Sequence, residues 1–147
     1  ADAWSHVAGF TVGQDLADRH LQFAAGGQFS LGKSHRAFSP LGPWVVTLDE
    51  LDDPDDLALG CSIDGKVMQD ARTSDLVFGV AQLVADLSAV VPLLPGDIIF
   101  TGTPAGVGFT RQPPRFLQPG ETLESWIEGV GTIRTRFTAP GGVQDGG

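Results

Sequence analysis

The sequence predicts an α+β fold that consists mainly of β-strands. Twenty glycines and ten prolines favour a turn-rich fold over a helical bundle. An Asp64-Gly65 pair between two apolar runs is typical of a β-hairpin with a type I′ turn. Near the C-terminus, the alternating segments 122–128 and 131–137 predict a further pair of strands.

Composition limits the classes of partner. Hydrophobic residues make up 41% of the chain and the mean hydropathy is +0.06, which indicates one folded domain. The net charge of -9 argues against nucleic acid and anionic membranes, because binding to either needs clustered Lys and Arg. A single cysteine, Cys61, allows no internal disulfide, and the sequence shows no membrane span or leader. These features predict a cytoplasmic protein.

The first third of the chain is expected to form a strand over 7–12 and a helix within 14–23. On such a helix Asp15, Arg19 and Gln22 share one face. The opposite face would carry Leu16, His20 and Phe23. Asp15 has two interpretations. It caps the helix, or it joins Arg19 and Gln22 in a pocket that suits a hard cation and an anionic substrate.

Lys33 follows a loop expected over 24–30 and lies between Gly32 and Ser34. A lone lysine is usually a solvated surface charge. Held at this position, before an apolar stretch bounded by prolines, it is alternatively a fixed cation for developing negative charge. A strand is expected next, over 44–48.

A helix is expected over about 75–90, with Thr73 or Ser74 as its N-cap. Apolar residues recur there at three- and four-residue spacing, which indicates a stripe that packs on the core.

The segment 96–108, GDIIFTGTPAGVG, predicts a buried strand over 98–100 that ends in a glycine-rich turn bearing hydroxyl groups. The turn is either structural or a phosphate-binding loop. It lacks the Gly-Lys-[Ser/Thr] ending of a P-loop.

Three blocks of the chain resemble the fumarylacetoacetate hydrolase family, in the family's order. GDIIFTGTPAGVG resembles the signature near the family's C-terminal end. QDLADRHLQ, from Gln14, is similar to the family's GNDVSARDLQ segment, with departures at Gln14, Asp18 and His20. GKS, from Gly32, and the later PLGP resemble a third family segment. The resemblance covers about 7–137.

The resemblance implies a rolled mixed β-sheet with few helices, usually in a homodimer. It also implies Mg²⁺, or Mn²⁺ or Ca²⁺, bound through carboxylates, with Asp15 as one ligand. By the same resemblance, Arg19 and Gln22 contact the carboxylate or carbonyl of the substrate, and Lys33 faces the substrate as the catalytic lysine. Gly102 and Thr103 close the pocket.

The implied function is metal-dependent hydrolysis or isomerisation of β-diketo or 2-oxo dicarboxylic acids through a metal-stabilised enolate, as in aromatic catabolism. Substrates of this class are acylpyruvates, fumarylpyruvate and 2-hydroxy-dienedioates. Two alternatives stay open: oxaloacetate decarboxylation, and a truncated, non-catalytic binding subunit. The second arises because the family's upstream Glu-x-Glu metal ligands do not occur in this sequence and the chain opens at Ala1 without Met. We therefore expect a catalytic domain lacking its upstream part over 1–138 and a disordered tail over 139–147.

Overall fold

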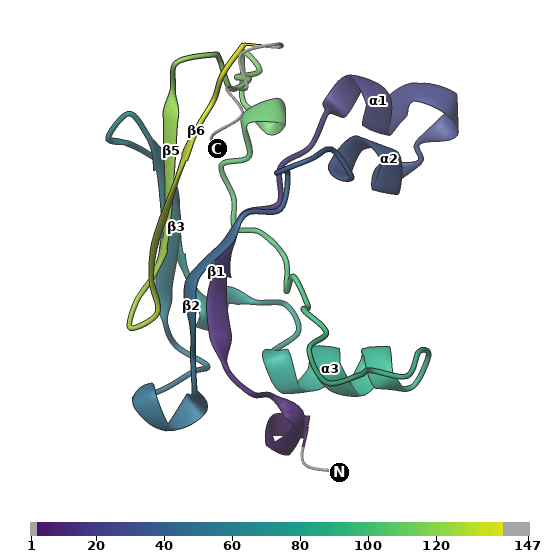
Figure 1. Cartoon of the computed structure of the whole chain (residues 1–147), viewed down its shortest axis with the longest axis vertical. Coiled ribbons are helices and arrows are strands. Elements are labelled where there is room, and N and C mark those ends of the chain that lie inside the picture. The colour runs from purple at the N-terminus through teal and green to yellow at the C-terminus, as the bar shows by residue number, and fades with distance from the viewer. Residues whose placement is uncertain (1–2, 140–147) are drawn as a thin grey trace, which may run out of the picture.

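A computed structural model describes residues 3–139 and confirms a mainly β, α+β fold (Figure 1). The strands are β1 Phe10–Gly13, β2 Leu41–Val46, β3 Ala58–Ile63, β4 Lys66–Arg72, β5 Thr122–Ile127 and β6 Gly131–Arg136. The helices are α1 Arg19–Phe23, α2 Phe29–Lys33 and α3 Val80–Ser88. The described residues also form five 3-10 turns: η1 Ala3–His6, η2 Ala24–Gly26, η3 Leu48–Glu50, η4 Thr73–Asp75 and η5 Gly108–Thr110. Residues 140–147 of the expected disordered tail lie outside the described residues.

The strands form two antiparallel sheets. One has four strands in the order β4-β3-β5-β6, and the other is the β1–β2 ribbon. In Figure 1 the larger sheet lies on one side, the ribbon in the middle and the three helices on the other side. None of the helices in the described part of the chain is both long and apolar enough to cross a membrane.

The predicted hairpin is confirmed. Ile63 of β3 pairs with Lys66 of β4, and the two residues between them have positive φ angles, 48° at Asp64 and 80° at Gly65. Positive φ at both central positions defines a type I′ turn, whose twist matches that of the flanking strands. The predicted strands near the C-terminus are also confirmed, as β5 and β6.

The core lies between the ribbon and the larger sheet. β1 packs on β5 and β6, and β2 packs on β6. One buried cluster joins Val12 and Val46 of the ribbon to Leu51, Leu57 and Val130. A second cluster comprises Leu16, Cys61 and Leu123, so the cysteine is buried in the core.

The helix within 14–23 is shorter than predicted. It begins at Arg19, and Asp18 is its N-cap, because Asp18 Oδ1 accepts a hydrogen bond from Leu21 N at 2.9 Å. Capping is therefore the wrong interpretation for Asp15. Burial does not follow the apolar residues of this segment, because Gln22 is completely buried whereas Phe23 is 51% exposed. Tertiary packing against α2 overrides the periodicity of so short a helix.

The helix expected over 75–90 begins later, at Val80, and its N-cap is Gly79. Thr73 and Ser74 are not its caps. The Thr73 hydroxyl accepts a hydrogen bond from the Leu57 backbone at 2.8 Å and so anchors the η4 turn. The apolar stripe is only partly buried, because Val80 packs inside while Val77 is 90% exposed.

The buried strand predicted over 98–100 is wrong. The segment has no regular secondary structure, and the exposed fractions are 57% for Ile98 and 42% for Phe100. A strand needs a neighbouring backbone to pair its N–H and C=O groups, and within residues 3–139 no strand pairs with this segment. The other boundaries shift by a few residues: 7–12 becomes β1, 44–48 becomes β2, and 24–30 is partly helical.

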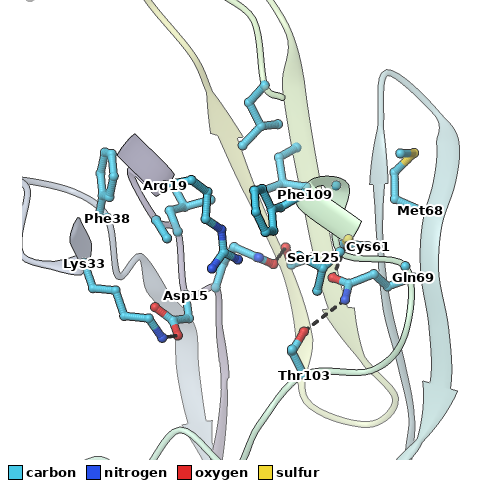
Figure 2. A pocket seen from close by; sticks show the side chains of 18 of the residues that line it. Asp15, Arg19, Lys33, Phe38, Cys61, Met68, Gln69, Thr103, Phe109 and Ser125 are labelled. Carbon is cyan, nitrogen blue, oxygen red and sulfur yellow. Dashed lines mark hydrogen bonds and ion pairs between the residues drawn. The ribbon is translucent and has the colours of Figure 1, made fainter. Parts of the chain in front are cut away.

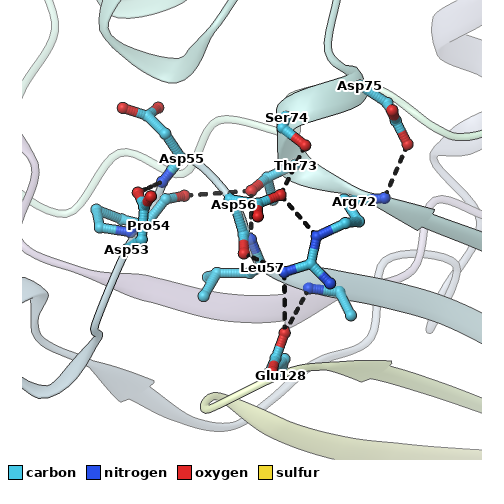
Figure 3. Close-up of polar contacts among 11 residues, drawn as sticks. Asp53, Pro54, Asp55, Asp56, Leu57, Arg72, Thr73, Ser74, Asp75 and Glu128 are labelled. Atoms are coloured by element: carbon cyan, nitrogen blue, oxygen red, sulfur yellow. Dashed lines mark hydrogen bonds and ion pairs between the residues drawn. The ribbon is translucent and has the colours of Figure 1, made fainter.

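A polar network joins the open end of the β3–β4 hairpin to the preceding loop (Figure 3). Arg72 Nε donates to Asp56 Oδ1 at 2.6 Å, and Ser74 Oγ donates to the same oxygen at 2.7 Å. Glu128 Oε2 accepts from Ala58 N at 2.9 Å and lies 3.5 Å from Arg72. The Arg72 guanidinium, followed by the Ser74 hydroxyl, holds the pKa of Asp56 below its usual value. The network therefore links Asp56, in the loop before β3, to the end of β4 and to Glu128 after β5.

The close packing of α1 on α2 predicts that a larger side chain at Gly32 would destabilise the protein. A Cβ at Gly32 would lie 2.7 Å from both Asp18 O and Gln22 Cβ. We therefore expect Gly32→Ala to lower the free energy of unfolding by about 1–3 kcal/mol, as overpacking does. Urea denaturation measures this.

Gly79→Ala is the matched control, because no atom lies within 4 Å of its added Cβ. A cost below about 1 kcal/mol is expected for this change at an N-cap. Equal effects of the two substitutions would contradict the packing argument.

Candidate active site

The sequence-predicted site residues converge on one open cleft between the helices, the ribbon and the larger sheet (Figure 2). The cleft is lined by all six of them: Asp15, Arg19, Gln22, Lys33, Gly102 and Thr103. Its volume of about 1380 Å³ exceeds the roughly 300–1,000 Å³ of most ligand pockets. Three segments far apart in the sequence therefore contribute polar groups to one wide cavity.

Asp15 and Lys33 form an ion pair on the cleft wall (Figure 2). The Lys33 Nζ donates to Asp15 Oδ2. The Asp15 carboxylate is available for this contact because Asp18, and not Asp15, caps α1. Both side chains are more than one-third exposed, 36% for Asp15 and 39% for Lys33, so the pair contributes little to stability. The Asp15–Lys33 pair places a carboxylate and an ammonium group together at the cleft surface.

Arg19 is held over the cleft by two contacts. Its Nη1 donates to Gln22 Oε1 at 2.7 Å, and its guanidinium carbon lies 5.5 Å from the centre of the Phe109 ring. The ring of Phe109 also lies 5.5 Å from that of Phe23, so it is itself supported. A guanidinium stacked on an aromatic ring keeps its remaining N–H groups free for a carboxylate.

Gln22 lies behind Arg19, with none of its surface exposed. Its Nε2 has no hydrogen-bond partner among the described residues, which is uncommon for a buried amide. In this arrangement Gln22 contacts Arg19, and contact of Gln22 with a substrate stays a prediction.

Asp15 is the one carboxylate among the six predicted site residues and so their one candidate metal ligand. Within residues 3–139, no group of three or more His, Cys, Asp or Glu side chains is placed to bind a metal ion. Mg²⁺ usually keeps several waters and takes one or two protein carboxylates together with ligand oxygens. Asp15 fits that limited role, since its Oδ1 is not used in the ion pair. The described residues alone do not form a complete metal site.

Sequence reasoning missed several residues of the cleft. Gln69 of β4 binds the segment that carries Thr103, and Phe109 supports Arg19. Ser125, which is buried on β5, donates to Gln14 Oε1 at 2.8 Å. No local pattern marks these residues, because their partners lie 34, 90 and 111 positions away in the sequence. The glycine-rich turn is confirmed as irregular structure.

The comparison with known protein families identifies the chain. Residues 1–138 match the profile described as "Fumarylacetoacetate (FAA) hydrolase C-terminal". The chain belongs to the fumarylacetoacetate hydrolase family. The chain shares 47% identity over 133 residues with a Bos taurus protein named mitochondrial oxaloacetate tautomerase FAHD2A. The match covers 90% of this chain and 42% of the relative.

Solved structures agree with the family assignment. A Mycobacterium smegmatis protein assigned to HpcE superposes with a TM-score of 0.91 and 57% identity, over 93% of this chain and 51% of that one. The fumarylpyruvate hydrolase from Pseudomonas aeruginosa, solved with Mn²⁺ and pyruvate, gives a TM-score of 0.82 and 32% identity, over 92% and 56% of the two chains. Hydrolase, isomerase and tautomerase names all occur among the relatives. The chain spans about half the length of the relatives it matches.

Proposed function

We propose that this chain provides the substrate-activating half of an enzyme that acts on β-diketo or 2-oxo dicarboxylic acids, as a hydrolase or isomerase. Acylpyruvates, fumarylpyruvate and 2-hydroxy-dienedioates are the substrate class. The observation that carries the proposal is the convergence of Asp15, Arg19, Lys33 and Thr103 on one cleft of a fumarylacetoacetate hydrolase family fold.

The shared chemistry of these reactions is an enolate next to a carboxylate, and the cleft offers groups for both. Arg19, stacked on Phe109, is suited to bind the substrate carboxylate. The Lys33 ammonium and the Thr103 hydroxyl are hydrogen-bond donors on the same cleft, suited to stabilise negative charge on the neighbouring oxygen. Gly102, with a φ of 123°, lets the backbone turn beside that hydroxyl. The chain thus supplies binding of the acid group and stabilisation of the enolate.

A divalent cation, Mg²⁺ or else Mn²⁺ or Ca²⁺, is the proposed cofactor, with Asp15 as one ligand. Such an ion polarises a carbonyl and offsets developing negative charge. The Mn²⁺ bound by the Pseudomonas aeruginosa relative supports this proposal. A homodimer and a cytoplasmic location stay predictions, and the bovine relative carries a mitochondrial name.

Oxaloacetate is a second candidate substrate, and one observation favours it. The bovine relative with 47% identity is named an oxaloacetate tautomerase. Tautomerisation moves a proton between carbon and oxygen through the same enolate, with no water attack and no bond cleavage between carbons. Decarboxylation of oxaloacetate would pass through a related enolate.

An assay of the purified protein with Mg²⁺ tests both candidates. Loss of the enol absorbance of acylpyruvates and of oxaloacetate is followed by ultraviolet spectroscopy, and products are separated by chromatography. Pyruvate released from an acylpyruvate indicates hydrolysis, and CO₂ indicates decarboxylation. A faster approach to the same enol-to-keto ratio, with no new product, indicates tautomerisation. No activity on any substrate would favour the non-catalytic subunit. Rescue by an added Glu-x-Glu-bearing fragment of a relative would restore the enzymatic proposal.

A further inference from the structure

The segment that carries Thr103 has no regular secondary structure, yet one side chain of β4 fixes it in place. Gln69 Nε2 donates to Thr103 Oγ1 at 2.9 Å and to the Pro104 carbonyl oxygen at 2.7 Å. Figure 2 shows the first of these bonds as a dashed line between the two side chains. Gln69 is therefore the direct link between the rigid sheet and the Thr103 hydroxyl.

A second clamp holds the same segment a few residues later. Arg111 donates to the carbonyl oxygens of Gly106, at 3.0 Å, and of Met68, at 2.6 Å. A Cβ at Gly106 would lie only 2.2 Å from Met68 O, so the two backbones are in direct contact. These contacts hold the segment against β4 independently of Gln69, so loss of the Gln69 bonds need not detach it from the strand.

The orientation of the Gln69 amide is determined by its partners. The Pro104 carbonyl only accepts hydrogen bonds, so the NH₂ end of the amide must face it. The opposite end, Oε1, accepts from the Cys61 Sγ at 3.2 Å. Burial raises the pKa of the Cys61 thiol, which therefore keeps its proton at neutral pH. A flipped amide would lose these contacts.

This arrangement restricts the direction in which the Thr103 hydroxyl can donate its hydrogen. Its oxygen accepts a hydrogen from Gln69, so the hydroxyl's own hydrogen cannot point along that bond. Thr103 is exposed on the cleft, where that hydrogen is left for an anionic ligand. Without the Gln69 donor, the hydroxyl is free to rotate and loses this directionality.

We propose that Gln69 is a positioning residue that makes the Thr103 hydroxyl a hydrogen-bond donor into the cleft, aimed at the oxyanion of a bound enolate. The inference rests on the proposed function for the identity of the ligand. The hydrogen-bond relay from Cys61 through Gln69 to Thr103 is a property of the protein alone. Two measurements separate these claims.

The first measurement tests the relay without any ligand. In ¹⁵N-labelled protein, the side-chain amide signals of Gln69 are identified by their loss in Gln69→Met. We expect Thr103→Val to shift one of the two amide protons and to speed its exchange with water, whereas Thr103→Ser leaves both unchanged. Identical amide signals in Thr103→Val and the native protein would overturn the relay.

The second measurement tests the direction of the hydroxyl. Oxalate, a planar dianion that mimics the enolate of a 2-oxo acid, is titrated in the presence of Mg²⁺ by calorimetry. We expect Gln69→Met to weaken oxalate binding at least fivefold in the native background, but less than twofold in the Thr103→Val background. Gln28→Met, at an exposed position with no side-chain cap hydrogen bond, is the matched control and should bind normally.

Each outcome decides one claim. Equal weakening in both backgrounds would show that Gln69 only anchors the segment, and it would overturn the positioning role. No weakening in the native background would overturn it as well. If native protein fails to bind oxalate, the proposed function fails. The amide signals then still decide whether Gln69 orients Thr103.

Discussion

Asp15→Asn is expected to weaken Mg²⁺ or Mn²⁺ binding at least tenfold. Asp15 is the one carboxylate among the six predicted site residues, and the described residues offer no cluster that would replace it. Asparagine keeps the size of the side chain but removes the charge that a hard cation requires. Calorimetric titration, or the decrease of the free Mn²⁺ signal in electron paramagnetic resonance, measures the loss.

The ion pair with Lys33 adds a second readout to this experiment. A cation bound to Asp15 competes with the Lys33 ammonium for the same carboxylate, because two positive charges there repel each other. Mg²⁺ should therefore change the side-chain NMR signals of Lys33 in native protein but not in Asp15→Asn. Asp70→Asn, at an exposed position on β4, is the control for the loss of one negative charge. Native metal affinity in Asp15→Asn would reject Asp15 as a ligand.

Lys33→Met is expected to lower kcat by roughly 10²- to 10³-fold, the usual cost of removing one donor to a developing oxyanion. Methionine keeps the length of the side chain and removes only its charge and donors. KM should change little if the ammonium interacts mainly with the transition state. Steady-state kinetics on the substrate found in the assay measures this, and metal titration should show retained binding.

Stability provides the control for the lysine experiment. Because both members of the Asp15–Lys33 pair are substantially exposed, breaking the pair should cost less than about 1 kcal/mol. A large fall in kcat with near-native urea denaturation therefore indicates chemistry and not unfolding. Lys66→Met, at the exposed start of β4, should behave as the native protein does. Unchanged kcat in Lys33→Met would remove Lys33 from the catalytic set.

Local patterns predicted those parts of the fold whose signals are local. The Asp64-Gly65 turn specifies its own backbone conformation, and the strands on either side follow from it. The alternation before and after Gly129 likewise predicted β5 and β6. In contrast, the five residues of α1 are too few for periodicity to determine which face is buried.

The predicted strand over 98–100 failed for a different reason. Its apolar residues resemble those of a buried strand, but burial depends on what lies next to the segment in space. In the described structure Phe100 instead lies against Gly13, at the start of the cleft, where a Cβ on the glycine would be 2.7 Å from the Phe100 ring. The segment is apolar, as a buried strand would be, but no strand within residues 3–139 pairs with it.

The sequence by itself determined the family, the mainly β class and the six site residues that the structure places around the cleft. Short motifs carry this information, because their residues lie close together along the chain. Only the tertiary structure revealed how those residues are held: Lys33 on Asp15, Arg19 between Gln22 and Phe109, and Thr103 on Gln69. Apart from the local Arg19–Gln22 bond, these contacts are long-range and depend on how the ribbon, the sheet and the helices pack, and that packing leaves no mark at any single position.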